Sequence, residues 1–197
     1  MESGHIVGQF YTNLTLHGVD QRRVIETLSA NYRKAFVSPA INGMVVVYDE
    51  ECEQQNPQVI MDVGRHLSAL FNCPLLTVRV HDDDVLCYWL FDKGKTSDEY
   101  VSSPSYFDPS PQPAEPEGGD AAKLCQAFGC AAPAHEVDAI LRKSAVDADG
   151  FLSETERHRA LAEALGLPVC CVGVGYESLK AGRVPEDVHP GQLVQVD

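Results

Sequence analysis

Residues 75–91 read LLTVRVHDDDVLCYWLF, and this stretch does most to decide the fold. Two runs rich in β-branched and aromatic residues, 75–80 and 85–91, lie on either side of the polar tetrapeptide HDDD. Such runs favour extended backbone. Asp favours turns, because its side chain hydrogen-bonds to nearby backbone groups. The stretch therefore predicts two antiparallel strands joined by a short turn.

The residues before this hairpin predict two further strands and two helices. Asn56 and Pro57 suit the start of a helix, as N-cap and first-turn residue, and apolar residues then recur at helical spacing. The β-branched run MVVVY, 44–48, predicts a buried strand, and the alternating polarity of 6–17 predicts a half-buried one. In chain order the expected elements are strand 6–17, helix 21–36, strand 44–48, helix 57–71 and the hairpin.

The residues after the hairpin contain a proline-rich segment. Residues 102–118 hold five of the chain's twelve prolines, which indicates a stiff loop or linker. A strand is predicted before it and a mainly helical region after it. The expected elements are strand 96–101, helices 120–128, 135–143 and 153–166, and strand 169–174.

This order of elements predicts an α+β fold. We expect a mixed sheet of about 4–6 strands with the helices packed on one face. Residues 1–101 would form a β-α-β-α-β-β(-β) core, and 102–118 would connect it to 119–197. This last segment has few large apolar residues, so we expect it to complete the same compact domain and not to fold alone.

The chain is acidic, and its charge is unevenly distributed. Its 29 acidic and 15 basic residues give a formal net charge of −14. Residues 1–48 contain four basic and three acidic residues, so the excess acidity lies after Tyr48. Nucleic acid and anionic membrane would be repelled, and we expect neither as a partner. A basic protein is the favoured partner.

The cysteines indicate a reducing compartment. The chain has seven, an odd number, and its N-terminus, MESGHIVGQF, carries no apolar signal segment. We therefore expect reduced thiols and a cytoplasmic location. No apolar run approaches the roughly 18 residues that a membrane-spanning helix needs.

Acidic residues follow two of the predicted strands. If strands 44–48 and 75–80 are parallel strands joined by helix 57–71, their carboxyl ends lie on the same edge of the sheet. A solvated acidic rim, a contact surface for a basic partner, and a divalent cation site with oxygen ligands are three readings of that edge. The residues concerned are Asp49, Glu50, Glu51, His81, Asp82, Asp83 and Asp84.

A second acidic stretch, 145–156 (AVDADGFLSETE), resembles the calcium-binding loop of EF-hand proteins. Asp147, Asp149 and Glu156 fall at the third, fifth and twelfth positions of that loop. The resemblance covers these twelve residues and lacks the first ligand, because Ala145 has no side-chain oxygen. A turn followed by a helix with Ser153 and Glu156 as its capping box explains the same residues.

Tyr88 and Trp89 are adjacent in a predicted strand, so their side chains point to opposite faces of the sheet. We expect the C-terminal segment to cover the second face. The alternative is an exposed aromatic side chain, which would favour a protein-binding surface.

The sequence contains no nucleophile elbow and no phosphate-binding loop. We therefore expect a non-enzymatic cytoplasmic protein that recognises a basic partner through an acidic surface. The sharpest form of this hypothesis is an antitoxin-like or immunity-like inhibitor of a basic nuclease. The residues expected to bind the partner are Asp49, Glu50, Glu51, Asp82, Asp83 and Asp84.

Two alternatives involve a divalent cation, and no other cofactor is predicted. The first is a metal-dependent hydrolase that uses the same sheet edge together with His81. The second is a degenerate EF-hand-like calcium module that uses Asp147, Asp149 and Glu156.

Overall fold

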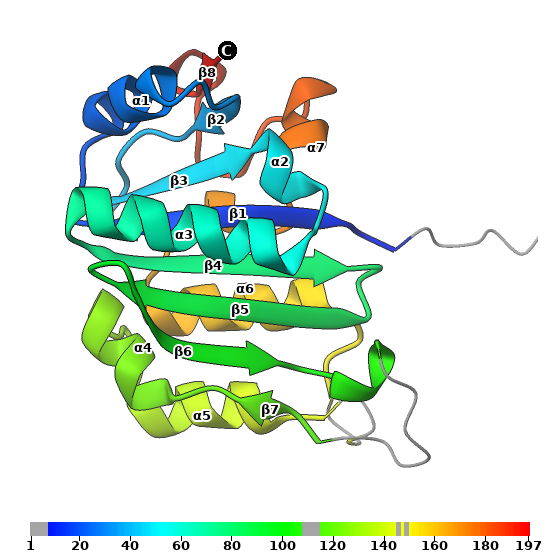
Figure 1. The fold of residues 1–197 in the computed structure, drawn as a ribbon. Coiled ribbons are helices and arrows are strands. Elements are labelled where there is room, and N and C mark those ends of the chain that lie inside the picture. Colours follow the sequence, from blue (N-terminus) through cyan, green and yellow to red (C-terminus); the bar gives the residue numbers. More distant parts are fainter. Residues whose placement is uncertain (1–7, 108–114, 145–146, 148–149) are drawn as a thin grey trace, which may run out of the picture.

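The computed structural model describes residues 8–107, 115–144, 147 and 150–197. One open sheet of eight strands runs through them, in the order β7-β6-β5-β4-β1-β3-β2-β8 (Figure 1). Every neighbouring pair of strands is antiparallel. The strands are β1 (Tyr11–His17), β2 (Ala35–Val37), β3 (Met44–Asp49), β4 (Pro74–His81), β5 (Val85–Asp92), β6 (Lys95–Val101), β7 (Glu117–Gly118) and β8 (Val194–Val196).

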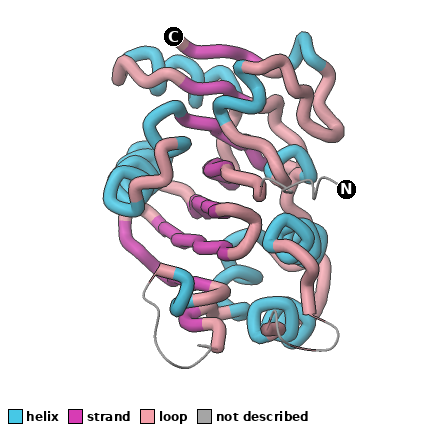
Figure 2. Tube along the Cα trace, turned by 90° about the vertical axis from the view of Figure 1, so that its right-hand side faces the viewer, coloured by secondary structure: helices cyan, strands magenta, loops and turns pink. Residues whose placement is uncertain are grey.

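Helices pack on both faces of the sheet, as the edge-on view in Figure 2 shows. One face, here called the α3 face, is covered by α1 (Gln21–Ala30), α2 (Glu50–Glu53) and α3 (Pro57–Phe71). The opposite face is called the α6 face. It is covered by α4 (Ala121–Phe128), α5 (Ala134–Arg142), α6 (Glu154–Leu165) and α7 (Tyr176–Lys180). The described chain also contains the 3-10 turns η1 (Pro104–Tyr106), η2 (Val169–Cys171) and η3 (Pro190–Gln192).

The hairpin predicted from residues 75–91 is confirmed. β4 pairs with β5 over their whole lengths, from Pro74 opposite Asp92 to His81 opposite Val85. Alternate residues of both strands enter the two apolar cores, so both faces of each strand are buried. Their continuous apolar runs follow from this, because a strand covered on both faces has no solvent side to carry polar residues.

The α+β class is confirmed, but the expected arrangement of the sheet is wrong in three respects. Eight strands are present where about 4–6 were predicted, all their pairings are antiparallel where a mixed sheet was predicted, and the helices do not share one face. The uncounted strands are β2, β7 and β8, which have two or three residues each and are too short to show a period. Both faces carry helices because both faces of the central strands are apolar.

Strands 44–48 and 75–80 run in the same direction, as the sequence predicts, but they are not adjacent in the sheet. β1 lies between β3 and β4 and is antiparallel to both. β3 and β4 therefore point in the same direction, and their carboxyl ends reach the same edge of the sheet with one strand between them. This edge is at the right of Figure 1.

Two other predicted elements differ from the structure. The predicted helix 21–36 ends at Ala30, and residues 35–37 form β2 instead. The predicted strand 169–174 is the 3-10 turn η2 followed by loop. This segment is held against the central strand by Asn13, whose side-chain amide donates to the backbone oxygens of Cys171 and Val174.

The expectation that every cysteine is reduced is wrong for one pair. Cys125 in α4 and Cys130 just after it form a disulfide, while the other five cysteines are free and buried. Within the described part of the chain, no helix is long and apolar enough to cross a membrane.

Candidate functional site

Asp49, the first of the predicted partner-binding acids, has a structural role. Its side chain is 1% exposed and accepts hydrogen bonds from the backbone N–H groups of Glu51 and Cys52, which caps α2. The Arg33 guanidinium binds the same carboxylate through two N–H groups, with Nε 2.6 Å from Oδ2. A charge paired in this way inside the protein is not available to a partner.

Glu50 and Glu51 also lie near basic side chains of the protein itself. One Glu51 oxygen lies 3.2 Å from Nη1 of Arg33. The two oxygens of Glu50 lie 4.0 Å from Nζ of Lys34 and 3.9 Å from Nζ of Lys180. The acidic residues that follow β3 are therefore largely balanced by local positive charge.

Asp83 joins the β4–β5 turn to the start of α6. One of its carboxylate oxygens accepts hydrogen bonds from the backbone N–H and the hydroxyl of Thr155, at 2.8 and 2.7 Å. Its backbone oxygen also accepts the N–H of Glu154. A carboxylate at this position satisfies free N–H groups of the helix N-terminus and interacts favourably with its dipole.

Asp82 and Asp84 flank this contact and lie in a hollow of about 440 Å³ with Gly8, Leu152 and Ser153. Asp84 is exposed and Asp82 is half-buried. Neither has an ion pair with a basic side chain in the described ranges. The β4–β5 turn and residues 152–153, which are far apart in sequence, thus line the same hollow.

Aromatic side chains surround His81 beside this hollow. The His81 ring lies 4.8 Å from that of Phe10, 5.7 Å from that of Tyr106 and 5.5 Å from that of Phe107, between centroids. Its Nδ1 is hydrogen-bonded to the side-chain oxygen of Gln55 at 2.5 Å. Burial and the neighbouring Arg79 charge lower the pKa of His81, against an opposing effect of Asp82.

Of the residues of the EF-hand resemblance, Asp147 and Glu156 are each held by local hydrogen bonds. Asp147 is exposed, and its carboxylate accepts the backbone N–H of Ser144. Glu156 forms the capping arrangement, since its carboxylate accepts the N–H of Leu152 and its own N–H donates to Ser153. Asp149 lies outside the described residues. Over the described ranges, no group of three or more His, Cys, Asp and Glu side chains is placed to hold a metal ion.

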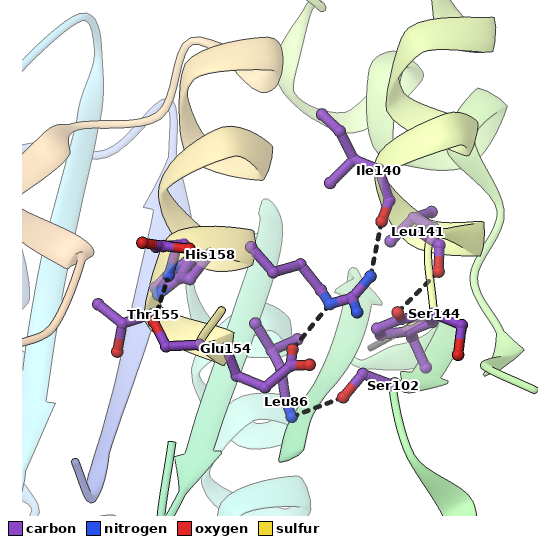
Figure 3. A network of polar contacts seen from close by, with 12 residues as sticks. Leu86, Ser102, Ile140, Leu141, Ser144, Glu154, Thr155 and His158 are labelled. Carbon is purple, nitrogen blue, oxygen red and sulfur yellow. Dashed lines mark hydrogen bonds and ion pairs between the residues drawn. The ribbon is translucent and has the colours of Figure 1, made fainter. Parts of the chain in front are cut away.

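A buried polar network under α6 was not predicted from the sequence (Figure 3). Glu154 and Arg157 form an ion pair of 2.7 Å with both side chains at most 5% exposed, and Arg157 also donates to the backbone oxygen of Ile140. His158 Nδ1 is hydrogen-bonded to the Tyr11 hydroxyl at 2.8 Å. The spacing of these polar residues with Leu161 and Leu165 places them all on one helix face, and that was the available signal.

The same network contains a cysteine beside a histidine. Cys171 Sγ lies 3.5 Å from His158 Nε2. Burial raises the pKa of the Cys171 thiol, and it lowers the pKa of His158 to about 3. Both side chains are fully buried and neutral at physiological pH. A nucleophilic cysteine needs a thiolate and a path to substrate, and this pair offers neither.

Tyr88 and Trp89 are both buried, on opposite faces of β5. The Tyr88 side chain lies on the α6 face, and its hydroxyl donates a hydrogen bond to the Asp98 carboxylate at 2.7 Å. Trp89 is 8% exposed on the α3 face, where it contributes to the lining of a second pocket.

Comparison with protein-family models, with curated proteins and with solved structures finds no match to this chain. The functional argument therefore rests on the residues and geometry above.

Proposed function

We propose that this protein is a non-enzymatic binding protein for a basic protein partner. Its recognition surface is the end of the sheet where β4 turns into β5, here called the aromatic–acidic surface. An inhibitor of a basic nuclease, in the manner of an antitoxin or immunity protein, is the sharpest form of this proposal. The surface consists of Phe10, Asp82, Asp84, Tyr106, Phe107 and Leu152.

The observation that carries the proposal is the concentration of exposed apolar side chains at this end. Among the described residues, seven large apolar side chains are exposed, and four of them belong to this surface. Phe10 is 49% exposed, Phe107 50% and Leu152 93%. Exposed aromatic residues that lie together are typical of protein-binding surfaces, where they supply most of the binding energy.

The charge of the surface selects the partner. Asp82 and Asp84 stand beside the aromatic side chains without a basic side chain to balance them in the described ranges. The chain as a whole carries a net charge of −14. Such a field attracts a basic protein and accelerates its association.

This surface is narrower than the one predicted from the sequence. The acidic residues after β3 already interact with Arg33, Lys34 and Lys180, so we do not assign them to partner binding. Asp83 is occupied by the N-terminus of α6. The exposed aromatic side chains of Phe10, Tyr106 and Phe107 are assigned to partner binding instead.

The test is affinity capture from a native extract with four baits of known charge. The baits are the natural protein, Asp82→Asn/Asp84→Asn, Phe10→Ala/Phe107→Ala, and the control Asp92→Asn/Glu163→Gln. The control removes the same charge at the opposite ends of β5 and α6.

We expect the natural protein and the control to retain the same basic protein at low salt. The two surface variants should retain about tenfold less of it. Equal retention by all four baits, or no basic protein on any of them, would overturn the proposal.

A further inference from the structure

The seven cysteines of the chain fall into two groups that differ in their access to solvent. Five of them are free and at most 5% exposed: Cys52, Cys73, Cys87, Cys170 and Cys171. Burial also raises the pKa of each of these five thiols. Thiol–disulfide exchange needs an accessible sulfur and a thiolate, so these five cysteines are unreactive while the protein is folded.

The other two cysteines, Cys125 and Cys130, are half-buried and are bonded to each other. Cys125 lies in the last turn of α4, and Cys130 directly follows Gly129, the residue at which that helix ends. Both side chains pack at the margin of the apolar core on the α6 face. The cysteines that are partly open to solvent are therefore the ones that form the disulfide.

The packing of this part of the protein does not depend on the disulfide. The bridge joins residues with a sequence separation of five, so it restricts the unfolded chain less than a bridge between distant residues would. Phe128 is 4% exposed in the apolar core, and the Ala127 backbone oxygen is hydrogen-bonded to His17 Nδ1 at 2.8 Å. The N–H of Ala132 donates to the backbone oxygen of Ala164 at 2.9 Å. Breaking the S–S bond would leave these contacts in place.

The two sulfur atoms would also stay close together after reduction. Gly129 has a φ of 74°, and its N–H donates to the backbone oxygen of Cys125 at 2.8 Å. This helix cap turns the chain back and brings the Cα atoms of Cys125 and Cys130 to 4.5 Å. The cap is a backbone contact and does not require the S–S bond. Thiols held close in this way react with each other faster than with a second molecule.

We propose that Cys125 and Cys130 form a reversible redox site that exchanges with small thiols of the glutathione class. In the reduction, a glutathione thiolate attacks one sulfur, the S–S bond breaks, and a mixed disulfide forms. A second glutathione thiolate attacks the glutathione sulfur of this mixed disulfide, and glutathione disulfide leaves. Two electrons pass from the two glutathione molecules to the protein, and the two cysteine sulfurs each end with a proton. Glutathione disulfide is the oxidant for the reverse reaction.

The redox site lies at the opposite end of the sheet from the aromatic–acidic surface. α4 lines a cavity of about 180 Å³ together with Pro74, the first residue of β4, and Asp92, the last residue of β5. Figure 1 shows α4 at the left and the β4–β5 turn at the right. The inference therefore does not depend on the proposed recognition of a basic protein.

The test is alkylation of the folded full chain with N-ethylmaleimide, with the labelled cysteines identified by mass spectrometry of peptides. The protein is equilibrated with glutathione disulfide, then with reduced glutathione, and then again with glutathione disulfide, and a sample is labelled after each step. The five buried cysteines are controls within the same molecule, and circular dichroism reports whether the fold is kept. Cys125→Ser and Cys130→Ser each leave one partly exposed thiol without its partner.

We expect no labelled cysteine after the first step, labelling of Cys125 and Cys130 alone after reduction with an unchanged circular dichroism spectrum, and loss of this labelling after reoxidation. In each serine variant the remaining cysteine should form a lasting mixed disulfide with glutathione, which the natural protein should not accumulate.

Four results would overturn the proposal. They are labelling of Cys125 and Cys130 before reduction, failure of reduced glutathione to expose them in the folded protein, labelling of the buried cysteines together with them, and accumulation of the glutathione mixed disulfide in the natural protein.

Discussion

At the scale of single residues, the most unusual feature is a set of ionisable side chains buried under α6. Glu154, Arg157 and His158 are at most 4% exposed, although polar residues of these types are normally at the surface. Each has a partner inside the protein, the first two in an ion pair and the third with Tyr11. Burial of these side chains without such partners would be strongly destabilising, so the packing of α6 on the sheet depends on the network.

The buried His158 makes stability depend on pH. Burial, helped by the charge of Arg159, lowers its pKa from the ordinary 6.5 to about 3. Between these values the unfolded chain binds a proton that the folded protein does not. The free energy of unfolding therefore decreases as the pH falls through this window, by about 1.4 kcal/mol per pH unit.

We predict that His158→Gln weakens this dependence. Between pH 6 and pH 5, the unfolding free energy of the natural protein should fall about 1 kcal/mol further than that of the variant. Urea denaturation at the two pH values measures the difference. Burial raises the pKa of Glu53 and Glu154, which acts in the opposite direction, but both residues remain in the variant. Parallel pH dependences of the two proteins would show that His158 is not held neutral.

At the scale of elements, the β4–β5 turn and the N-terminus of α6 depend on each other through Asp83. Asp82 and Asp83 both have positive φ, 54° and 58°, a conformation in which glycine is relaxed. Only Asp83 binds Thr155 at the start of α6. The two positions therefore allow the contact to be separated from the backbone effect.

We predict that Asp83→Gly lowers the free energy of unfolding by about 1–2 kcal/mol more than Asp82→Gly does. Both substitutions change the backbone in the same way, and only the first removes the carboxylate that caps α6. Urea denaturation of the two variants gives the comparison. Equal stabilities would mean that the Asp83 contact contributes nothing to the docking of α6.

The elements themselves were largely predictable where their pattern is long. The β4–β5 hairpin and helices α3, α4, α5 and α6 follow from apolar spacing and from caps such as Asn56, Asp120 and Ser153. The short strands were not, because two or three residues show no period. The segment after Pro168 looks like a strand because VCCVGV is apolar, but it is buried by packing against Asn13 and not by pairing in the sheet.

The candidate site was less predictable than the fold, because it depends on the order of the strands in the sheet. Nothing local in the sequence places β1 between β3 and β4, so the acidic residues after the two strands were expected to be neighbours. The partners of Asp49 and Asp83, which are Arg33 and Thr155, could not be predicted either, because they lie far away in the sequence and follow no periodic pattern.

At the scale of the whole molecule, unbalanced negative charge and exposed aromatic side chains lie together at one end of the sheet, outside the two apolar cores. Ion pairs balance the acidic residues that follow β3, whereas Asp82 and Asp84 have no such pair in the described ranges and lie at the same end of the sheet as Phe10, Tyr106 and Phe107. This distribution suits recognition by attraction at long range followed by apolar contact at short range.

The most direct measurement of this central claim is the association rate constant of the captured basic partner as a function of salt concentration. It is compared between the natural protein, Asp82→Asn/Asp84→Asn and the control Asp92→Asn/Glu163→Gln. We predict that the natural protein and the control associate about tenfold faster at low salt than the surface variant, and that the advantage disappears at high salt. Rate constants that are equal for all three proteins at every salt concentration would contradict the account.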